Sequence, residues 1–511
     1  MKTVAGPTDR VLIVGAGLSG LAAALYLRGA GHEVTVVERA DHPGGRVGIH
    51  RGADYEMDNG ATVLTMPELI TDALAAVGTA PETGPEPLFI DRIEPGYHAR
   101  FRDGRAIEVY GDPDAMAAEV ERACGPGTSR HYRRLRGWLG EVFDAEYDRF
   151  MDSNFDSPFD LVKSRGARAD LAKLTRLGGF GRLGPQISRF IADPDLARLF
   201  TFQALYAGVA PAQALAVYAA IPNMDTCMGV YFPRGGMRAI ARSMAAAFVA
   251  AGGKLELRTD VERIEFEGRR ARGIRTTQGA RLDCDTLIVT ADLGALADLG
   301  VKRRRPLRAS PSAVVAMGTV PAEVSARWPG QAHHVIDFGE AWDGTFAEIT
   351  ARRGRGRVMS DPSLLITRPA CTDPGEYIER TDSSGRTQRH EPLSVLAPCP
   401  NLDSAPLNWE FLGPAYVREL LGVLEARGYV GIADHFTIDH IDTPHTWLAQ
   451  GMIAGTPFSA AHLFRQTGPF RTRNLVPSAD NVVLAGCGTT PGVGVPTALL
   501  SGKLAAARVT G

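Results

Sequence analysis

The chain begins with a pattern of hydrophobic and polar positions that predicts a strand, a helix and a second strand. Residues 10–14 (RVLIV) form a short apolar run rich in β-branched side chains, which predicts a buried strand. The Ala- and Leu-rich segment that follows has good helix propensity up to Leu27, and Gly29 and Gly31 are expected to end the helix. Residues 33–37 (EVTVV) predict the second strand. This order predicts a βαβ unit with two parallel strands.

A glycine-rich loop, residues 15–20 (GAGLSG), joins the first strand to the helix. Gly15 permits the tight turn, Gly17 lets the backbone approach a pyrophosphate, and Gly20 lets helix and strand pack closely. The helix N-terminus adds free N–H groups and the positive end of a dipole. Glu38 closes the second strand, where its carboxylate can accept hydrogen bonds from ribose hydroxyls. The loop predicts a dinucleotide site but does not by itself separate NAD from FAD.

The end of the chain repeats the order of strand, glycine loop and helix. Residues 481–485 predict a strand, Gly486 begins a second glycine turn, and residues 497–509 predict a helix. A helix N-terminus here can stabilise negative charge at the ring end of a bound dinucleotide, with Val493 and Val495 packed near the ring. The cofactor domain is therefore expected to use both ends of the chain.

The residues after the second strand distinguish FAD from NAD. Glu38 and Arg39 are followed by Gly44, Gly45 and Arg46, and this E-R-x(4)-G-G-R pattern resembles the two-dinucleotide-binding flavoproteins. That group includes amine oxidases, protoporphyrinogen oxidase and carotenoid desaturases, and in it the Gly-Gly-Arg segment runs along the FAD diphosphate toward the flavin. The resemblance implies FAD. NADP is disfavoured because a carboxylate at this strand end would repel a 2′-phosphate.

An ordered set of longer motifs narrows the resemblance. Its most specific members are FTFQALYAGVAPAQAL (200–215), GVYFPRGGM (229–237), DPSLLITRPACTDP (361–374) and GTPFSAAHLFRQTGPFRTRN (455–474). Together they resemble the carotenoid desaturase family, specifically the bacterial phytoene desaturases of the actinobacterial type, over nearly the whole chain. One departure is Thr490, which stands where many members carry a histidine before the Pro-Gly-x-Gly-x-Pro segment.

The resemblance implies an α/β fold with a Rossmann-type FAD-binding domain, amine-oxidase-like, and a mixed α+β substrate domain. The FAD-binding domain is predicted to be discontinuous and to combine residues 1–75, 225–300 and 475–511. Residues 76–224 and 301–474 are predicted to form the substrate-binding and membrane-associating region.

The implied reaction is desaturation of phytoene, with lycopene as the default product, by successive hydride transfers to flavin N5. A long hydrocarbon has no polar groups that could form hydrogen bonds, so the protein must recognise it by the shape of a tunnel and by burial of apolar surface. The terminal electron acceptor is a quinone or oxygen, and no catalytic acid or base is assigned.

Three alternatives stay open. A later-step carotenoid desaturase or oxygenase belongs to the same class. A flavin amine oxidase is less favoured because no aromatic pair lies near residues 486–496. A non-enzymatic prenyl-binding protein is opposed by the intact glycine loop, Glu38 and Arg46.

Composition and charge exclude other classes. The chain has 511 residues, enough for two or three domains, and its net charge of −2 gives no case for nucleic-acid binding. The six cysteines have irregular spacing without a C-x-x-C pair, as expected for reduced thiols in the cytoplasm. The longest uncharged run, residues 199–224, is broken by glycine and proline and predicts a buried core segment rather than a membrane span. The expected location is the cytoplasm, peripheral on the inner face of the cell membrane.

Several charged or reactive residues have a structural interpretation that we favour. Asp144, Glu146, Asp148 and Arg149 are expected on a solvated helix face, although one of them could serve the proton. The basic runs at residues 302–305 and 352–357 are expected in solvated loops, with contact to anionic lipid as the alternative. His333 and His334 are expected to be a packed or solvated pair, with no metal bound, and Cys487 a small packing residue without a covalent bond to flavin.

The residues expected to bind the cofactor are Gly15, Ala16, Gly17, Leu18, Ser19, Gly20, Glu38, Arg39, Gly44, Gly45, Arg46, Val261, Gly486, Val493 and Val495. Of these, Val261 is implied by the resemblance alone, as a backbone contact on the adenine side.

Overall fold

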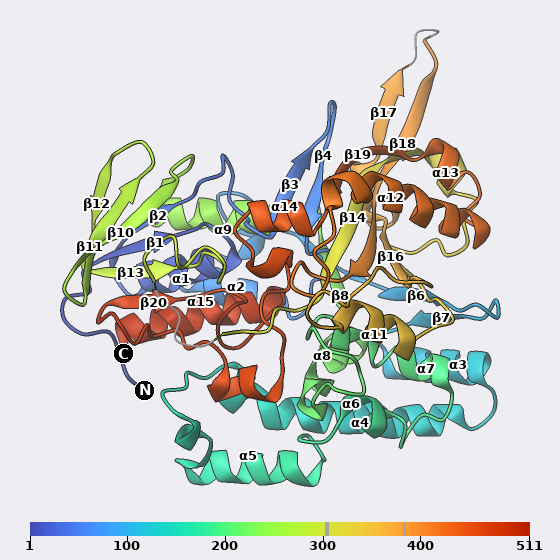
Figure 1. Ribbon diagram of the computed structural model, residues 1–511, viewed down its shortest axis with the longest axis horizontal. Helices are drawn as coiled ribbons and strands as arrows, with labels where there is room; N and C mark the ends of the chain where they lie inside the picture. Colours follow the sequence, from blue (N-terminus) through green and yellow to red (C-terminus); the bar gives the residue numbers. More distant parts are fainter. Residues whose placement is uncertain (302–305, 382–384) are drawn as a thin grey trace.

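The computed structural model describes residues 1–301, 306–381 and 385–511 of the chain. The predicted solvated loop at Lys302–Arg305 lies outside the described residues. The N- and C-termini lie close together at the same end of the molecule (Figure 1). The backbone N–H of Val4 donates to the carbonyl of Arg508 at 2.9 Å, so the two ends of the chain belong to one structural unit.

Five strands of the described residues form a parallel sheet in the order β20-β13-β1-β2-β9. Their bounds are β1 (Arg10–Val14), β2 (Glu33–Val37), β9 (Lys254–Glu256), β13 (Thr286–Val289) and β20 (Val482–Leu484). Val11 and Ile13 pack on one face of the sheet, and Leu12 and Val14 pack on the other. Both faces are buried, which explains why the central strands are apolar without interruption.

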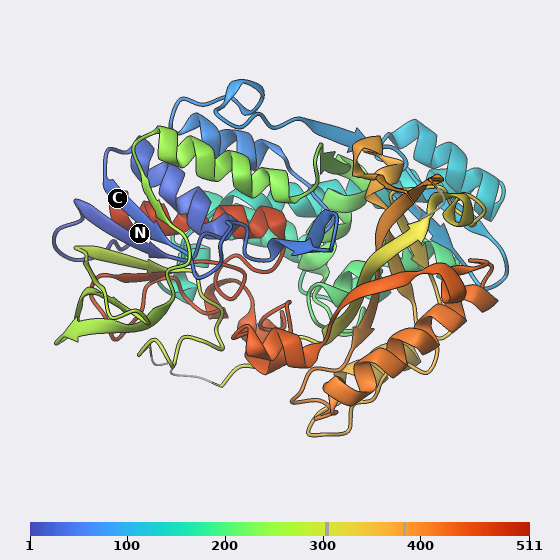
Figure 2. The same cartoon turned by 90° about the horizontal axis from the view of Figure 1, so that it is seen from above.

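Helices cover one face of this sheet and a second, smaller sheet covers the other (Figure 2). The helices are α1 (Leu18–Gly29), α2 (Glu68–Ala75), α9 (Arg238–Ala250) and α15 (Val495–Thr510). The smaller sheet is antiparallel, in the order β10 (Val261–Glu267), β11 (Arg270–Thr276) and β12 (Arg281–Asp283). Gly20 on α1 stands where a Cβ would lie 2.0 Å from the carbonyl of Gly15, so helix and loop can pack only with glycine here.

The expected elements of the parallel sheet are confirmed, with end positions that differ by a few residues. The final helix was expected at residues 497–509 and spans Val495–Thr510, and the strand expected at residues 481–485 is shorter, Val482–Leu484. All five parallel strands and their four helices fall inside the ranges predicted for the FAD-binding domain. The boundary residues themselves stay a prediction.

A second, larger sheet lies beside the first unit (Figure 1). Its order is β19-β14-β18-β16-β15-β6-β7, with β17 paired to β18. The bounds are β6 (Tyr97–Arg100), β7 (Ala106–Val109), β14 (Ser312–Pro321), β15 (His334–Asp337), β16 (Leu364–Thr367), β17 (Ile378–Thr381), β18 (Thr387–Cys399) and β19 (Thr437–Asp442). On β14, Val314 and Ala316 pack against α12 (Trp409–Ala426), whereas Ala313 and Val315 line a cavity on the opposite face. One face of this sheet is thus available to bind a ligand.

The other α-helices that the structure describes, and two strand pairs, belong to neither of these sheets. The helices on the substrate side are α3 (Pro113–Cys124), α4 (Thr128–Glu146), α5 (Arg165–Arg176), α6 (Leu183–Ile187), α7 (Pro194–Arg198) and α8 (Ala220–Asn223). The others are α10 (Ala322–Ser325), α11 (Asp343–Thr350), α13 (Ile432–His435) and α14 (Pro444–Ala449). The strand pairs are β3 (Val47–Arg51) with β4 (Glu56–Gly60), and β5 (Ile90–Ile93) with β8 (Val230–Pro233).

Two structural expectations outside the glycine loops can be compared with the structure. Most of the segment 199–224 is buried and forms short helical turns, as expected for a core segment. Among the helices that the structure describes, none is both long and apolar enough to cross a membrane.

Candidate cofactor and substrate site

One continuous cavity of about 1630 Å³ runs from the parallel sheet to the larger sheet. At one end its wall is made of both glycine loops; farther along it is made of aliphatic and aromatic side chains from β14, β18, α8 and α11. A pocket for one small ligand typically measures about 300–1,000 Å³, so this cavity exceeds the space that a single ligand needs.

The first glycine loop presents its backbone to this cavity. Gly15 has a positive φ of +104°, and Gly17 caps α1 without any side-chain hydrogen bond to the helix. A Cβ at Gly17 would stand only 3.8 Å from the Cα of Gly45, at ordinary contact distance. Because no side chain caps the start of α1, its first N–H groups can donate hydrogen bonds to an anionic ligand.

The Gly-Gly-Arg segment lies directly against this loop. Gly44 donates its N–H to the carbonyl of Ala16 at 2.9 Å and forms an isolated parallel bridge with Gly17. A Cβ at Gly44 would lie 2.2 Å from the carbonyl of Val47, and one at Gly45 would lie 3.1 Å from the Cα of Gly17. Two loops that are separate in sequence therefore meet backbone to backbone, and the positive φ of Gly44 and Gly45 is a conformation that glycine adopts without strain.

Glu38 joins the glycine loop to the second strand. Its carboxylate accepts a hydrogen bond from the backbone N–H of Ala16 at 2.8 Å and one from Ala40 at 2.9 Å. Each carboxylate oxygen has a further lone pair, and Glu38 lines the cavity, so it can still accept from a ribose hydroxyl.

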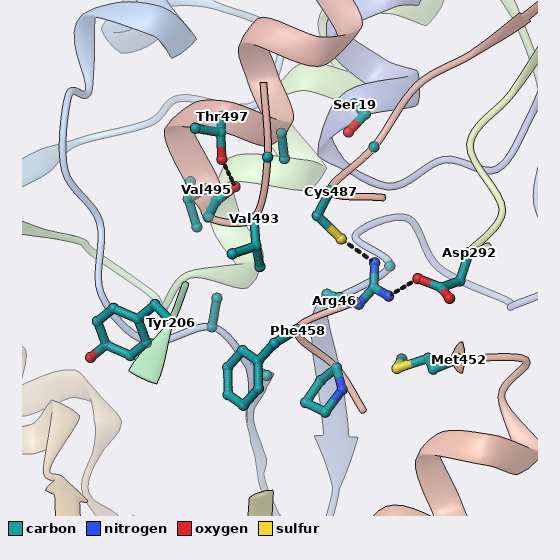
Figure 3. Close-up of a pocket in the computed structure, with 18 of the residues that line it drawn as sticks. Ser19, Arg46, Tyr206, Asp292, Met452, Phe458, Cys487, Val493, Val495 and Thr497 are labelled. Atoms are coloured by element: carbon teal, nitrogen blue, oxygen red, sulfur yellow. Dashed lines mark hydrogen bonds and ion pairs between the residues drawn. The ribbon is translucent and has the colours of Figure 1, made fainter. Parts of the chain in front are cut away.

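Arg46 lies at the meeting point of three distant segments (Figure 3). Its guanidinium donates to the Sγ of Cys487 at 2.7 Å and to the carboxylate of Asp292. Burial opposes the positive charge, but the cysteine and Asp292 outweigh it and hold the pKa of Arg46 above its ordinary value. The Nε of Arg46 is buried and has no hydrogen-bond partner, which leaves one donor for a ligand in the cavity.

The carboxyl-terminal loop contributes the opposite wall. Gly486, Val493 and Val495 line the cavity, and Gly494, with φ +130°, precedes the first residue of α15. Figure 3 shows Val493 and Val495 on the same side of the cavity as Thr497, which donates to the carbonyl of Gly494 at 3.1 Å.

Thr490, the departure from the family pattern, is buried and is absent from the cavity wall. The imidazole of His462 approaches this loop instead, with Nε2 2.5 Å from the place a Cβ would take on Gly492. His462 comes from a different segment, and burial lowers its pKa well below the usual range.

The structure brings nearly all of the predicted cofactor residues to this cavity. Those on its wall are Gly15, Gly17, Leu18, Ser19, Glu38, Arg39, Gly44, Gly45, Arg46, Val261, Gly486, Val493 and Val495. Ala16 and Gly20 lie behind the wall: Ala16 orients Glu38, and Gly20 permits the close packing of α1. Their contact with a cofactor stays a prediction.

Sequence reasoning missed the aromatic side chains of the cavity. Tyr206 and Phe458 lie on the wall facing Val493 (Figure 3). The expectation that no aromatic pair lies near the C-terminal glycine loop holds in the sequence but is wrong in space, because these two residues come from segments far from that loop.

Two acids lie on the cavity wall, Glu146 and Asp225, and sequence reasoning singled out only Glu146. The expectation that Glu146 lies on a solvated helix face is wrong: its Oε2 is buried, without a hydrogen-bond partner. It follows the buried Leu139 and Val142 at spacings of seven and four, so the helical period carried a signal that the charged neighbours obscured. Asp225 accepts a hydrogen bond from the hydroxyl of Tyr97 at 3.4 Å, and burial raises its pKa to about 7.

The two histidines and the basic run at residues 352–357 can also be compared with the structure. His333 and His334 are buried, and burial lowers the pKa of His334 to about 4. Within the described ranges, no group of three or more histidine, cysteine or acidic residues is placed to hold a metal ion. The arginines at 352, 353, 355 and 357 are exposed, as expected for a solvated loop.

The cavity fits FAD on the evidence of its own atoms. The start of α1 has no side chain that would exclude a pyrophosphate, Glu38 retains lone pairs for a ribose, and Arg46, which lines the cavity, has an unpartnered Nε. These are the donors and spaces that a dinucleotide requires.

Comparison with known proteins gives the same picture. The family described as flavin-containing amine oxidoreductase matches residues 18–320 and 417–510. The chain is 51% identical to the phytoene dehydrogenase of Streptomyces griseus, over 100% of this chain and 97% of the relative. It is 28% identical to the lycopene-forming phytoene desaturase of Paracoccus sp., over 97% and 96% of the two chains.

Among solved structures, an oxidoreductase from Methanosarcina mazei has a TM-score of 0.60 at 17% sequence identity, covering 97% of this chain and 99% of that one. At this identity the likeness concerns the fold, and it matches the predicted fold class of a Rossmann-type flavoprotein domain joined to a mixed substrate domain.

Proposed function

Because this chain belongs to the phytoene desaturases of the flavin-containing amine oxidoreductase family, we propose that it desaturates phytoene to lycopene with bound FAD. The observation that carries the proposal is the single cavity, whose wall is glycine backbone with charged groups at one end and hydrocarbon elsewhere. One space thus offers a dinucleotide site that opens directly into a site for a long apolar molecule.

The two ends of the cavity have different tasks. At the polar end, Gly17 and Arg46 hold the diphosphate and Glu38 holds a ribose; bound FAD supplies the acceptor for a hydride. At the apolar end, side chains such as Val315, Leu396 and Phe346 bind the polyene by shape and by burial, at about 25 cal/mol for each Å² removed from water. The protein's contribution is to orient one carbon–carbon bond against the flavin and to keep water away.

The mouth of the cavity supports a peripheral contact with a membrane. Phe180, Phe464 and Phe470 line the cavity and yet are 43%, 57% and 37% exposed, so they mark its opening. Phe159, 79% exposed, lies shortly before α5, whose Leu171 and Leu174 line the cavity. Exposed aromatic side chains at the entrance suit a substrate that is delivered from lipid.

Basic residues accompany this opening. In the segment 158–182 and beside Phe464, the basic side chains are Lys163, Arg165, Arg168, Lys173, Arg176, Arg182 and Arg465, and the acidic ones are Asp160 and Asp170. Asp170 is paired to Arg149 at 2.6 Å. Each basic residue near an anionic leaflet contributes about 1 kcal/mol, so we assign this face to the inner face of the cell membrane.

The test is conversion of phytoene in vesicles. Purified protein, FAD and phytoene-loaded vesicles containing anionic lipid should yield lycopene, with a quinone or oxygen as the electron acceptor in parallel reactions. Accumulation of a carotene that is less desaturated than lycopene would show that the protein carries out fewer desaturation steps than proposed. Consumption of a coloured carotene alongside unchanged phytoene would move the protein to a later step. Peroxide formation from an amine without carotene turnover would contradict the proposal.

A further inference from the structure

We propose that Glu146 is the catalytic base that removes the proton during desaturation. The inference rests on the proposed function and assigns a role that the reaction requires. When a carbon–carbon single bond becomes double, one hydrogen leaves with its electron pair as hydride to FAD. The neighbouring hydrogen leaves as a proton, and the electrons of its C–H bond form the new π bond. The Glu146 carboxylate takes that proton and becomes a neutral acid.

The location of Glu146 carries the proposal. It is the last residue of α4, and the chain continues into a π-helical turn, Tyr147–Met151. Such a change of helical register often occurs at functional sites. Phe150 and Met151 from this turn line the same cavity, so the carboxylate lies in an apolar section of the wall.

The surroundings connect Glu146 to the flavin loop. The hydroxyl of Tyr218 lies within electrostatic range of the Glu146 carboxylate. The ring of Tyr218 packs edge-on against His462 at 5.2 Å, and His462 contacts the C-terminal loop at Gly492. Glu146 therefore lies along the wall that leads to the predicted flavin position.

The chemistry of the group suits a base. Its Oε2 is buried and has no hydrogen-bond partner, so no donor competes with an incoming proton. Burial raises the pKa of Glu146 to about 8, near the working range expected of a general base. Asp225 is the other buried acid on the wall, but it already accepts a hydrogen bond from Tyr97, which makes it the weaker candidate.

Other charged groups near Glu146 do not neutralise it. On its own helix and the following turn, Asp144, Asp148 and Arg149 are exposed, and Arg149 pairs with Asp170. From the packed elements, the buried Arg471 acts on Tyr218 and His462 and gives its hydrogen bonds to backbone carbonyls, including that of Thr489 at 2.8 Å.

The test compares Glu146→Gln with Asp144→Asn, which removes an exposed carboxylate from the same helix. In single-turnover reactions, Glu146→Gln should slow desaturation by about 10²–10⁴-fold, the usual contribution of a general base. The wild-type rate should rise with pH with a midpoint near 8, and this dependence should disappear in the variant. Flavin content and polyene binding should not change, and Glu146→Asp should restore part of the rate with its pH dependence.

A second readout does not depend on turnover. Infrared difference spectra of the holoenzyme between pH 6 and pH 10 should contain a carboxylic-acid C=O band that titrates near pH 8 and is absent in Glu146→Gln. The band of Asp225, which titrates near pH 7, should remain in the variant. An active wild type with an unchanged Glu146→Gln rate, or a band near pH 8 that survives the substitution, would overturn the assignment alone. A wild type that does not act on phytoene would overturn the proposed function together with the assignment.

Discussion

The guanidinium of Arg46 donates to the Sγ of Cys487 at 2.7 Å, although the two residues are 441 positions apart in the sequence. The contact joins the Gly-Gly-Arg segment to the carboxyl-terminal glycine turn across the cavity. Asp292, at the end of β13, holds the same guanidinium from a third segment. The polar end of the cavity is therefore fixed by three loops that each follow a strand of the parallel sheet.

Gly17→Val should remove most of the bound FAD. The added methyl groups would occupy the space beside Gly44 and Gly45 that the pyrophosphate needs. We expect the affinity for FAD to fall by at least about tenfold, which corresponds to ~1.4 kcal/mol. The measurement is flavin absorbance per polypeptide, with circular dichroism to show that the fold persists. Gly422→Val, on the exposed side of α12 with open space around it, is the control. A normal flavin content in Gly17→Val would contradict the predicted pyrophosphate site.

Asp292→Asn should destabilise the protein by about 3 kcal/mol, because it leaves Arg46 without its carboxylate partner in a largely buried position. The unfolding midpoint in urea should fall, and flavin retention should weaken with it. Asp283→Asn removes an exposed carboxylate that pairs with Arg281 and should cost less than about 1 kcal/mol. If the two substitutions lowered the free energy of unfolding equally, the ion pair between Arg46 and Asp292 would contribute no more to stability than an exposed pair.

Cys487 should not be attached to the flavin. Burial raises the pKa of its thiol, and the neighbouring Arg46 offsets this only in part, so little thiolate is available at neutral pH. Acid precipitation should release all of the flavin into the supernatant, and Cys487→Ser should still bind FAD. Flavin that remains on the precipitated wild-type chain, but not on the serine variant, would show a covalent bond.

Binding to anionic vesicles should depend on the aromatic rim of the cavity. Replacement of both Phe464 and Phe470 by serine should lower the amount of protein that floats with vesicles by at least about tenfold, since burial of each ring contributes ~1.5–3 kcal/mol when complete. High salt should weaken binding further, through the basic residues around α5. Phe411→Ser is the matched control, because Phe411 is 84% exposed on α12 and does not line the cavity. Equal binding by all three proteins would place the membrane contact elsewhere.

The buried acids should make the folded state less stable at higher pH. The pKa of Glu146 is raised from 4.5 to about 8 and that of Asp225 from 3.8 to about 7, so the folded chain binds more protons than the unfolded chain across this interval. This contribution is complete below pH 4 and is lost as the pH rises toward 8. The free energy of unfolding should fall from pH 5 to pH 8 by more in the wild type than in Glu146→Gln. Identical slopes would contradict the raised pKa of Glu146.

The sequence was most informative where the chemistry is local. The loop 15–20 and Glu38 lie within one βαβ unit, and their spacing alone predicts that they are grouped where the structure has the cavity wall. Asp292 could be placed at the end of a strand, but its contact with Arg46 depends on how distant loops meet. No local pattern reports such a contact.

Glu146 shows a different limit of sequence reasoning. It sits among charged residues that favour a solvated face, and only its spacing from Leu139 and Val142 indicates the buried side of α4. The aromatic residues Tyr206 and Phe458 could not be assigned to the site either, because their place depends on packing between segments.

The pairing of the two chain ends has a consequence for biosynthesis. The ribosome makes β1 and the first glycine loop before the predicted substrate region, and it makes β20 and α15 only after most of that region has been translated. Until they arrive, α1 lacks its largest helical neighbour, and the parallel sheet has an open edge at β13. The cofactor site can therefore be completed only after the loop that joins β20 to α15 has been made.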